Sequence, residues 1–153
     1  MRREESAGGV VFRRGQTAIE VLVISPMYAR RWHLPKGHRE PGEDPRITAL
    51  REVWEEGGVE ADCLEELGEI VYSFVHQRET VEKHVRFFLM AYRGGAPENH
   101  DLEVRAARFI PYPEVLTWLS FENERALVRQ GYLRLSRYRP EWFTREDTIP
   151  SGH

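Results

Sequence analysis

The sequence predicts a single α/β or α+β domain in which helices pack on a β-sheet. The chain has 153 residues, 41% of them hydrophobic, and this length suits one compact domain. Short apolar segments typical of strands are interspersed with longer segments of helical periodicity. The aromatic residues (4 Trp, 6 Tyr and 7 Phe) can fill a core, which excludes a disordered chain. We expect residues 1–153 to form one domain, with its core at about residues 6–138 and a loosely held tail at 139–153.

Two strands are expected near the N-terminus, at residues 7–12 and 18–24. Residues 13–17 between them contain Gly15 and are typical of a hairpin turn. The second strand is apolar on both faces, so we expect it to lie inside a sheet that is covered on both sides.

Proline and glycine mark the next two elements. Residues 35–45 contain three prolines and two glycines, which predicts a loop. Residues 46–57 contain no proline, and no glycine before the pair Gly57-Gly58. This pattern predicts a helix that ends at the glycine pair.

The second half of the chain adds further strands and then helices. The predicted strands are 67–76, 84–92 and 106–110, and the predicted helices are 111–119 and 123–137. The acidic residues of the segment 60–69 are expected to be a solvated connection.

Charge and cysteine content exclude several classes of protein. The net charge of −3 excludes a generally basic nucleic-acid binder, although 20 of the 22 basic residues are Arg. Residues 36–69 alone hold 11 acidic and 4 basic residues. One cysteine, Cys63, excludes a disulfide framework within this chain and a cysteine-based zinc site. With no signal-peptide core and no apolar run that could span a bilayer, we expect a soluble, cytoplasmic protein without nucleic-acid or membrane partners, and its oligomeric state stays open.

The helix predicted at 46–57 has an apolar side. At about 100° per residue, Ile47, Leu50 and Trp54 fall on one side, and Ala49 and Val53 extend that arc. We expect this side to pack on the sheet.

Three carboxylates fall together on another side of the same helix. Glu52, Glu55 and Glu56 lie within one turn, where like charges destabilise one another. Solvation and an ion pair with Arg51 are one explanation, and a bound divalent metal is the other. Carboxylate-only ligation suits Mg²⁺ or Mn²⁺ and suits zinc poorly, because no histidine joins the cluster. Four histidines show no ligand spacing and are expected to be structural or exposed, namely His33, His76, His84 and His100.

The segment 37–59 resembles the Nudix box, Gly-x5-Glu-x7-Arg-Glu-U-x-Glu-Glu-x-Gly-U, in which U is aliphatic. Every specified position matches, namely Gly37, Glu43, Arg51, Glu52, Val53, Glu55, Glu56, Gly58 and Val59. Segments 7–11, 32–38 and 103–109 also look like parts of the Nudix family. The resemblance implies an α/β/α sandwich around a mixed sheet, and the metal-dependent hydrolysis of a nucleoside diphosphate linked to another moiety.

The resemblance also implies roles for residues of the box. The metal ligands would be Glu52 and Glu56, with Glu55 beside them and the carbonyl of Gly37 as a fourth. Arg51 would hold Glu43 and the loop in place rather than touch the substrate.

Residues outside the box are candidates for the remaining roles. Glu103 is the candidate general base, with a solvated loop acid as the alternative. Lys36 could reach a substrate phosphate. Lys83 and Arg86 could do the same, but a strand turns residues three apart to opposite faces, so at most one of them is expected to point at the site. Tyr72 could stack on a base, although a core or cross-strand position is the stronger expectation.

The residues at the start of the box narrow the range of candidate substrates. The segment 34–38 resembles bacterial diadenosine polyphosphate hydrolases and also the diphosphoinositol polyphosphate branch, and the first is the leading hypothesis. Tyr72 lies closer to the box than the tyrosine that is common in that first group. ADP-ribose pyrophosphatases usually carry a proline after the box. Here no proline occurs between Pro45 and Pro97, so that branch is disfavoured. A nucleoside triphosphate pyrophosphohydrolase stays open, as does, more distantly, a non-catalytic nucleotide-binding module.

Overall fold

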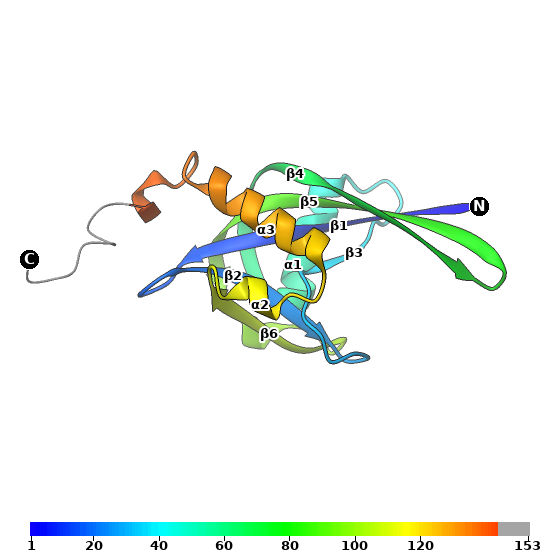
Figure 1. Ribbon diagram of the computed structural model, residues 1–153, viewed down its shortest axis with the longest axis horizontal. Helices are drawn as coiled ribbons and strands as arrows, with labels where there is room; N and C mark the ends of the chain where they lie inside the picture. The colour runs from blue at the N-terminus through cyan, green and yellow to red at the C-terminus, as the bar shows by residue number, and fades with distance from the viewer. Residues whose placement is uncertain (144–153) are drawn as a thin grey trace, which may run out of the picture.

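A mixed β-sheet with helices on both faces forms the body of the protein (Figure 1). The computed structural model describes residues 1–143. The strands are β1 (Arg2–Arg14), β2 (Ile19–Pro26), β3 (Lys36–His38), β4 (Val59–His76), β5 (Glu79–Gly95) and β6 (Val104–Pro111). The α-helices are α1 (Pro45–Gly57), α2 (Val115–Trp118) and α3 (Glu122–Leu135), and short 3₁₀ turns lie at Pro97–Asn99 and Pro140–Phe143.

The strand order is β4-β5-β1-β2-β6, and β3 pairs with β1 beside this path. The β1–β5 pair is parallel, while the pairs of β1 with β2 and β3, of β2 with β6 and of β4 with β5 are antiparallel. Alternate side chains of the strands therefore feed two cores. One core includes Val53 of α1 and Phe88, and the other includes Val128 of α3 and Phe87. As Figure 1 shows, α1 lies on the opposite face of the sheet from α2 and α3.

Most predicted elements are present, and several are longer than predicted. The hairpin of β1 and β2 and the helix α1 are confirmed. β1 begins at Arg2 because its first residues pair in parallel with Val81–Val85 of β5. The loop predicted at 35–45 contains the short strand β3, which is held by its pairing with β1.

The prediction of a solvated connection at residues 60–69 is wrong. These residues belong to β4, which starts directly after Gly58 and pairs with β5 along its whole length. Their carboxylates take part in ion pairs with arginines of β5, α3 and the segment after α3, so part of the Arg excess has structural partners. The pairs are Glu66 with Arg86, Glu65 with Arg134, and Asp62 with Arg139.

Strands β4 and β5 continue beyond the body of the sheet as a long hairpin (Figure 1). A tight turn connects them at Gln77 and Arg78, whose φ angles are 51° and 65°. In this hairpin Tyr72 of β4 lies opposite Lys83 of β5.

The start of the tail contacts the core. Residues 140–143 form a 3₁₀ turn, and Trp142 and Phe143 pack against the α3 side of the sheet. The rest of the expected tail lies outside the described residues. Within residues 1–143 no helix combines the length and apolarity needed to cross a membrane.

Candidate active site

Helix α1 begins and ends at specific residues of the box. Asp44 caps its N-terminus by accepting a hydrogen bond from the backbone N–H of Arg46, and Pro45 occupies the first turn. At the other end Gly58 has a φ of 73°, and its N–H donates to the carbonyl of Trp54. A Cβ at Gly58 would lie 2.3 Å from the carbonyl oxygen of Ala96, so this position requires glycine.

The side of α1 that faces the sheet differs from the prediction. Ile47 and Trp54 are 54% and 48% exposed, so their assignment to the packed side is wrong. Ala49 and Val53 are fully buried as expected, and Glu52 is buried with them at 8% exposure. The helix turns its small residues to the sheet because the backbones approach closely there, and this brings one glutamate of the acidic cluster inward.

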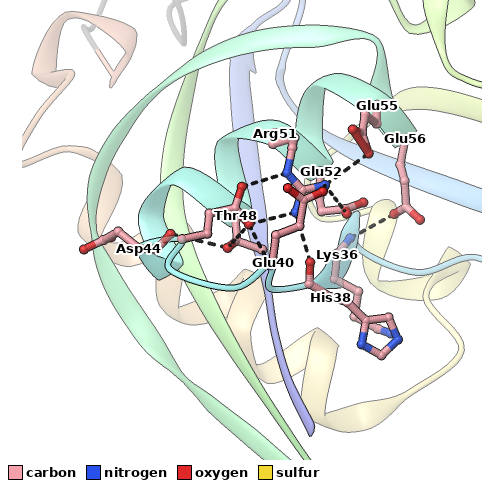
Figure 2. Close-up of polar contacts among 10 residues, drawn as sticks. Lys36, His38, Glu40, Asp44, Thr48, Arg51, Glu52, Glu55 and Glu56 are labelled. Carbon is pink, nitrogen blue, oxygen red and sulfur yellow. Dashed lines mark hydrogen bonds and ion pairs between the residues drawn. The ribbon is translucent and has the colours of Figure 1, made fainter.

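Arg51 holds the carboxylates in place from the centre of the site (Figure 2). Its Nε and Nη2 donate to the two oxygens of Glu43, each at 2.9 Å, as the resemblance implied. Its Nη1 donates to Glu52 at 2.9 Å and to Glu55 at 3.3 Å. Hydrogen bonds from Arg51 and then from Thr48 lower the pKa of Glu43 to about 2. Glu43 is therefore ionised at neutral pH and fixes the orientation of the guanidinium.

Gly37 lies directly against the carboxylate of Glu52. A Cβ at Gly37 would lie 2.1 Å from the carboxyl carbon of Glu52, so any side chain here would displace that carboxylate. Burial and the charge of Glu55 raise the pKa of Glu52, although Arg51 opposes this shift. The contact brings the backbone of β3 within reach of the acidic side of α1.

Glu56 has a carboxyl group with a strongly raised pKa. One oxygen of its carboxylate accepts a hydrogen bond of 2.9 Å from the backbone N–H of Lys36 (Figure 2). Burial raises its pKa to about 8, and the charges of Glu52 and Asp101 contribute to the increase. Negative charge at this site is therefore under-compensated by the surrounding protein.

These residues fit a hard divalent cation by their chemistry. Among residues 1–143 no group of three His, Cys, Asp or Glu side chains lies close enough together to hold a metal ion as it stands. The glutamates are instead held by hydrogen bonds from Arg51 and from the backbone N–H of Lys36. The donors are nevertheless all oxygen atoms, and a cation would offset the repulsion that raises the pKa values of Glu52 and Glu56.

Two adjoining cavities meet at Lys36, and the first of them reaches Glu56 in the C-terminal half of α1. The first, of about 320 Å³, is lined by Glu56 and Glu103 together with Lys36 and residues of the loop after β2. The second, of about 430 Å³, lies between β4, β5 and the start of α3. Both volumes are in the range of small-molecule sites. Tyr28, His33 and Lys36 line both cavities, so the two spaces share one wall.

The predicted substrate residues are only partly brought together. Lys36 lines both cavities, and Tyr72, which is 40% exposed, lines the second one rather than lying in the core. Burial lowers the pKa of Lys83, and the charge of Lys36 lowers it further, so Lys83 lies near Lys36. Arg86 is not brought to the cavities. It alternates along β5 with Val85 and Phe87 of the second cavity, so it lies on the α1 face of the sheet, where it pairs with Glu66 at 2.6 Å.

Several residues at the cavities carried no recognisable signal in the sequence. His33 lines both cavities, and within residues 1–143 its buried Nε2 has no hydrogen-bond partner. Burial lowers its pKa to about 4, so its ring is neutral at pH 7. Phe121, Asn123 and Glu124 reach the second cavity from the start of α3, which lies far along the chain from the box.

Comparison with known proteins identifies the family. Residues 2–131 match the model of the NUDIX domain. The chain belongs to the NUDIX domain family. It is 38% identical over 131 residues to a MutT4 protein of Mycobacterium tuberculosis, a match that covers 82% of this chain and 53% of the relative. This chain thus spans about half the length of that relative.

A second relative is matched over nearly its whole length. The chain is 31% identical over 144 residues to the asymmetrical bis(5′-nucleosyl)-tetraphosphatase of Sus scrofa, covering 83% of this chain and 92% of that enzyme. Among solved structures, the Ap4A hydrolase binary complex of C. elegans superposes with a TM-score of 0.64 at 19% identity, covering 88% of this chain and 99% of the other. The predicted Nudix fold and the resemblance to Nudix hydrolases are confirmed.

Proposed function

We propose that this Nudix protein uses a divalent cation to hydrolyse a phosphoanhydride bond in substrates with a linked nucleoside diphosphate, and that dinucleoside polyphosphates are its main substrates. The observation that carries the proposal is the position of Glu56. This carboxylate, on the acidic side of α1, lines a cavity whose wall at Lys36 is shared with a second cavity. A substrate with two nucleosides joined by a phosphate chain fits two adjoining spaces that meet at a lysine. The relative named as an asymmetrical bis(5′-nucleosyl)-tetraphosphatase supports the same substrate class.

The cation would be Mg²⁺ or Mn²⁺, held by Glu52 and Glu56, with Glu55 and the carbonyl of Gly37 as further ligands. When bound, it would neutralise phosphate charge and lower the pKa of a water molecule. Arg51 keeps the carboxylates oriented through the hydrogen bonds that it donates to Glu52 and Glu55.

The residues of the shared wall would bind the phosphate chain. Lys36 of this wall supplies positive charge, and so does Lys83, which is near enough for Lys36 to lower its pKa. The Nε2 of His33, which has no hydrogen-bond partner among residues 1–143, can donate a hydrogen bond to a phosphate oxygen. The phenol ring of Tyr72 offers a face on which a base can stack. Arg86 has no part in this proposal.

Glu103 would act as the general base. It is exposed and lines the same cavity as Glu56, so a water molecule between them can be approached by its carboxylate. The carboxylate would accept a proton as the water oxygen bonds to phosphorus, and the bond from phosphorus to the bridging oxygen would break. The leaving phosphate would depart with the electron pair of that bond.

A substrate panel tests the proposal. Wild type is incubated with Mg²⁺ and diadenosine tetraphosphate, nucleoside triphosphates, ADP-ribose, sugar nucleotides or an inositol pyrophosphate, and the products are identified by chromatography. Glu56→Gln serves as the inactive variant, and Glu60→Gln is the matched control because Glu60 is exposed just beyond the helix. We expect asymmetric cleavage of diadenosine tetraphosphate to have the highest kcat/KM, with a loss of more than about a hundredfold in Glu56→Gln alone. A higher kcat/KM for nucleoside triphosphates or the inositol pyrophosphate would show that this compound, and not a dinucleoside polyphosphate, is the preferred substrate. No turnover of any compound would favour a non-catalytic binding module.

A further inference from the structure

A buried carboxyl group lies at the second cavity, away from the glutamates of the box. Glu124, in the first turn of α3, is 4% exposed and lines this cavity. Its Oε1 accepts a hydrogen bond of 2.9 Å from the backbone N–H of Leu34, which comes just before the Lys36 segment. Among residues 1–143 no other hydrogen bond and no ion pair involves this carboxyl group. The catalytic scheme above does not use it.

The surroundings of Glu124 suit a flat aromatic ligand. The second cavity combines aromatic and aliphatic walls with polar side chains, which is the usual lining of a small-molecule site. The apolar walls are formed by Ile70 and Tyr72 of β4, Val85 and Phe87 of β5, and Phe121 before α3. If a nucleobase stacks on these walls, as the proposed function requires, Glu124 lies at the edge of the same space.

Glu124 is held in its neutral form at pH values below about 7. Burial raises its pKa to about 7, although the N–H of Leu34 and the charge of Lys36 act against this increase. The other ionisable groups on the cavity wall are Arg31, His33, Tyr28 and Tyr72. His33 is neutral near pH 7, since burial lowers its pKa to about 4. Because Oε1 accepts from Leu34, the proton of the neutral carboxyl group lies on the other oxygen, Oε2.

We infer that Glu124 determines base specificity by donating a hydrogen bond from Oε2 to the Watson–Crick edge of the bound base, which selects adenine over guanine and hypoxanthine. This inference rests on the proposed function, in which a nucleoside occupies the second cavity. The N1 atom of adenine is an acceptor and matches the donor. The N1–H group of guanine or hypoxanthine is itself a donor, so at this position two donors would face each other with no acceptor between them.

The glutamine variant makes a directional prediction. In Glu124→Gln the amide oxygen must accept from the N–H of Leu34, which turns the NH₂ group toward the base. Glu124→Gln therefore presents a permanent donor, and its preference for adenine should persist at alkaline pH. In wild type the preference should decline above about pH 7, as the carboxyl group ionises and becomes an acceptor only.

The test compares three substrates that differ only in their bases. The kcat/KM values of diadenosine, diinosine and diguanosine tetraphosphate are measured from pH 6 to pH 8.5 for wild type, Glu124→Gln, Glu124→Leu and the control Glu60→Gln. We expect wild type at pH 6 to prefer the diadenosine compound by about tenfold or more. Glu124→Gln should retain this ratio at every pH, and Glu124→Leu should bring the ratio close to one. Ionisation of Glu56 acts on all three substrates equally and cancels in the ratio.

A purely structural role of Glu124 gives a different result. If the carboxyl group only anchors the backbone at Leu34, Glu124→Leu would lower the rates for all three substrates equally and leave their ratio unchanged, which would overturn the inference. A loss of the preference in Glu124→Gln would also overturn it. Calorimetric binding of ADP and IDP measures the same base ratio without turnover. Failure of hydrolysis with a preserved ADP preference would thus refute the proposed function alone, and equal binding of ADP and IDP would refute the role of Glu124.

Discussion

The pKa of Glu56 implies that this residue lowers the stability of the metal-free protein. Burial raises the pKa from 4.5 to about 8, so the folded state holds this proton more tightly than the unfolded state does. Between these two pH values the folded state binds more protons, and the free energy of unfolding therefore falls as pH rises. At pH 7 the decrease amounts to about 3 kcal/mol, from 1.36 kcal/mol per pH unit above 4.5.

Glu56→Gln removes this penalty while keeping the size of the side chain. In EDTA at pH 7 we expect the variant to be more stable than wild type by up to about 3 kcal/mol, which raises the Tm by about 6–12 °C for a chain of this length. Near pH 4.5 the two proteins should have nearly equal stability. Circular dichroism during thermal and urea unfolding measures both, and Glu60→Gln should behave as wild type at each pH.

The dependence on pH distinguishes this explanation from general damage. A Glu56→Gln protein that is less stable than wild type at pH 7, or a difference that does not grow between pH 4.5 and pH 7, would refute the burial argument. Adding Mg²⁺ should then raise the free energy of unfolding of wild type, because a ligand that binds only the folded state stabilises that state. The free energy of unfolding of Glu56→Gln should stay unchanged, because this variant lacks a carboxylate that would bind the cation.

Variants at four further positions test the site. Gly37→Ala should lower kcat by more than about a hundredfold, because its Cβ would lie 2.1 Å from the carboxyl carbon of Glu52; a near-normal rate in a steady-state assay would show that this contact is unimportant. Arg51→Lys should lower both the Tm and kcat, because a single ammonium group cannot keep the bidentate hydrogen bonds to Glu43; unchanged melting would contradict this. Tyr72→Ala should raise KM with little change in kcat, whereas Tyr72→Phe should match wild type, and equal effects of the two changes would exclude stacking. Glu103→Gln should lower kcat by about 10²–10⁴-fold, and a small loss would move the general base elsewhere.

The sequence predicted the local order of elements well, because that order depends on neighbouring residues. Gly57-Gly58 ended α1 where predicted, and the apolar run at β2 lies inside the sheet. The extent of β4 could not be predicted, since the acidic residues at 60–69 resemble a solvated segment until β5 and the arginines around α3 pair with them.

The same limit applies to the candidate site. The three glutamates of α1 follow from helical spacing and from the box, but the burial of Glu52 depends on how α1 rotates against β1. Periodicity placed Ile47 and Trp54 on the packed side, although close backbone contact favours the smaller Ala49. The cavity walls at Phe121 and Glu124 are brought to the box only by the docking of α3, which no local pattern encodes.

Binding of Mn²⁺ tests the central claim, that the glutamates of α1 hold a divalent cation. Electron paramagnetic resonance measures the free Mn²⁺ remaining as the metal is titrated into the protein without nucleotide. We predict that wild type and Glu60→Gln bind Mn²⁺ equally well and that Glu52→Gln and Glu56→Gln bind it more than about tenfold more weakly. Equal Mn²⁺ affinity in all four proteins would contradict the claim and place the metal elsewhere.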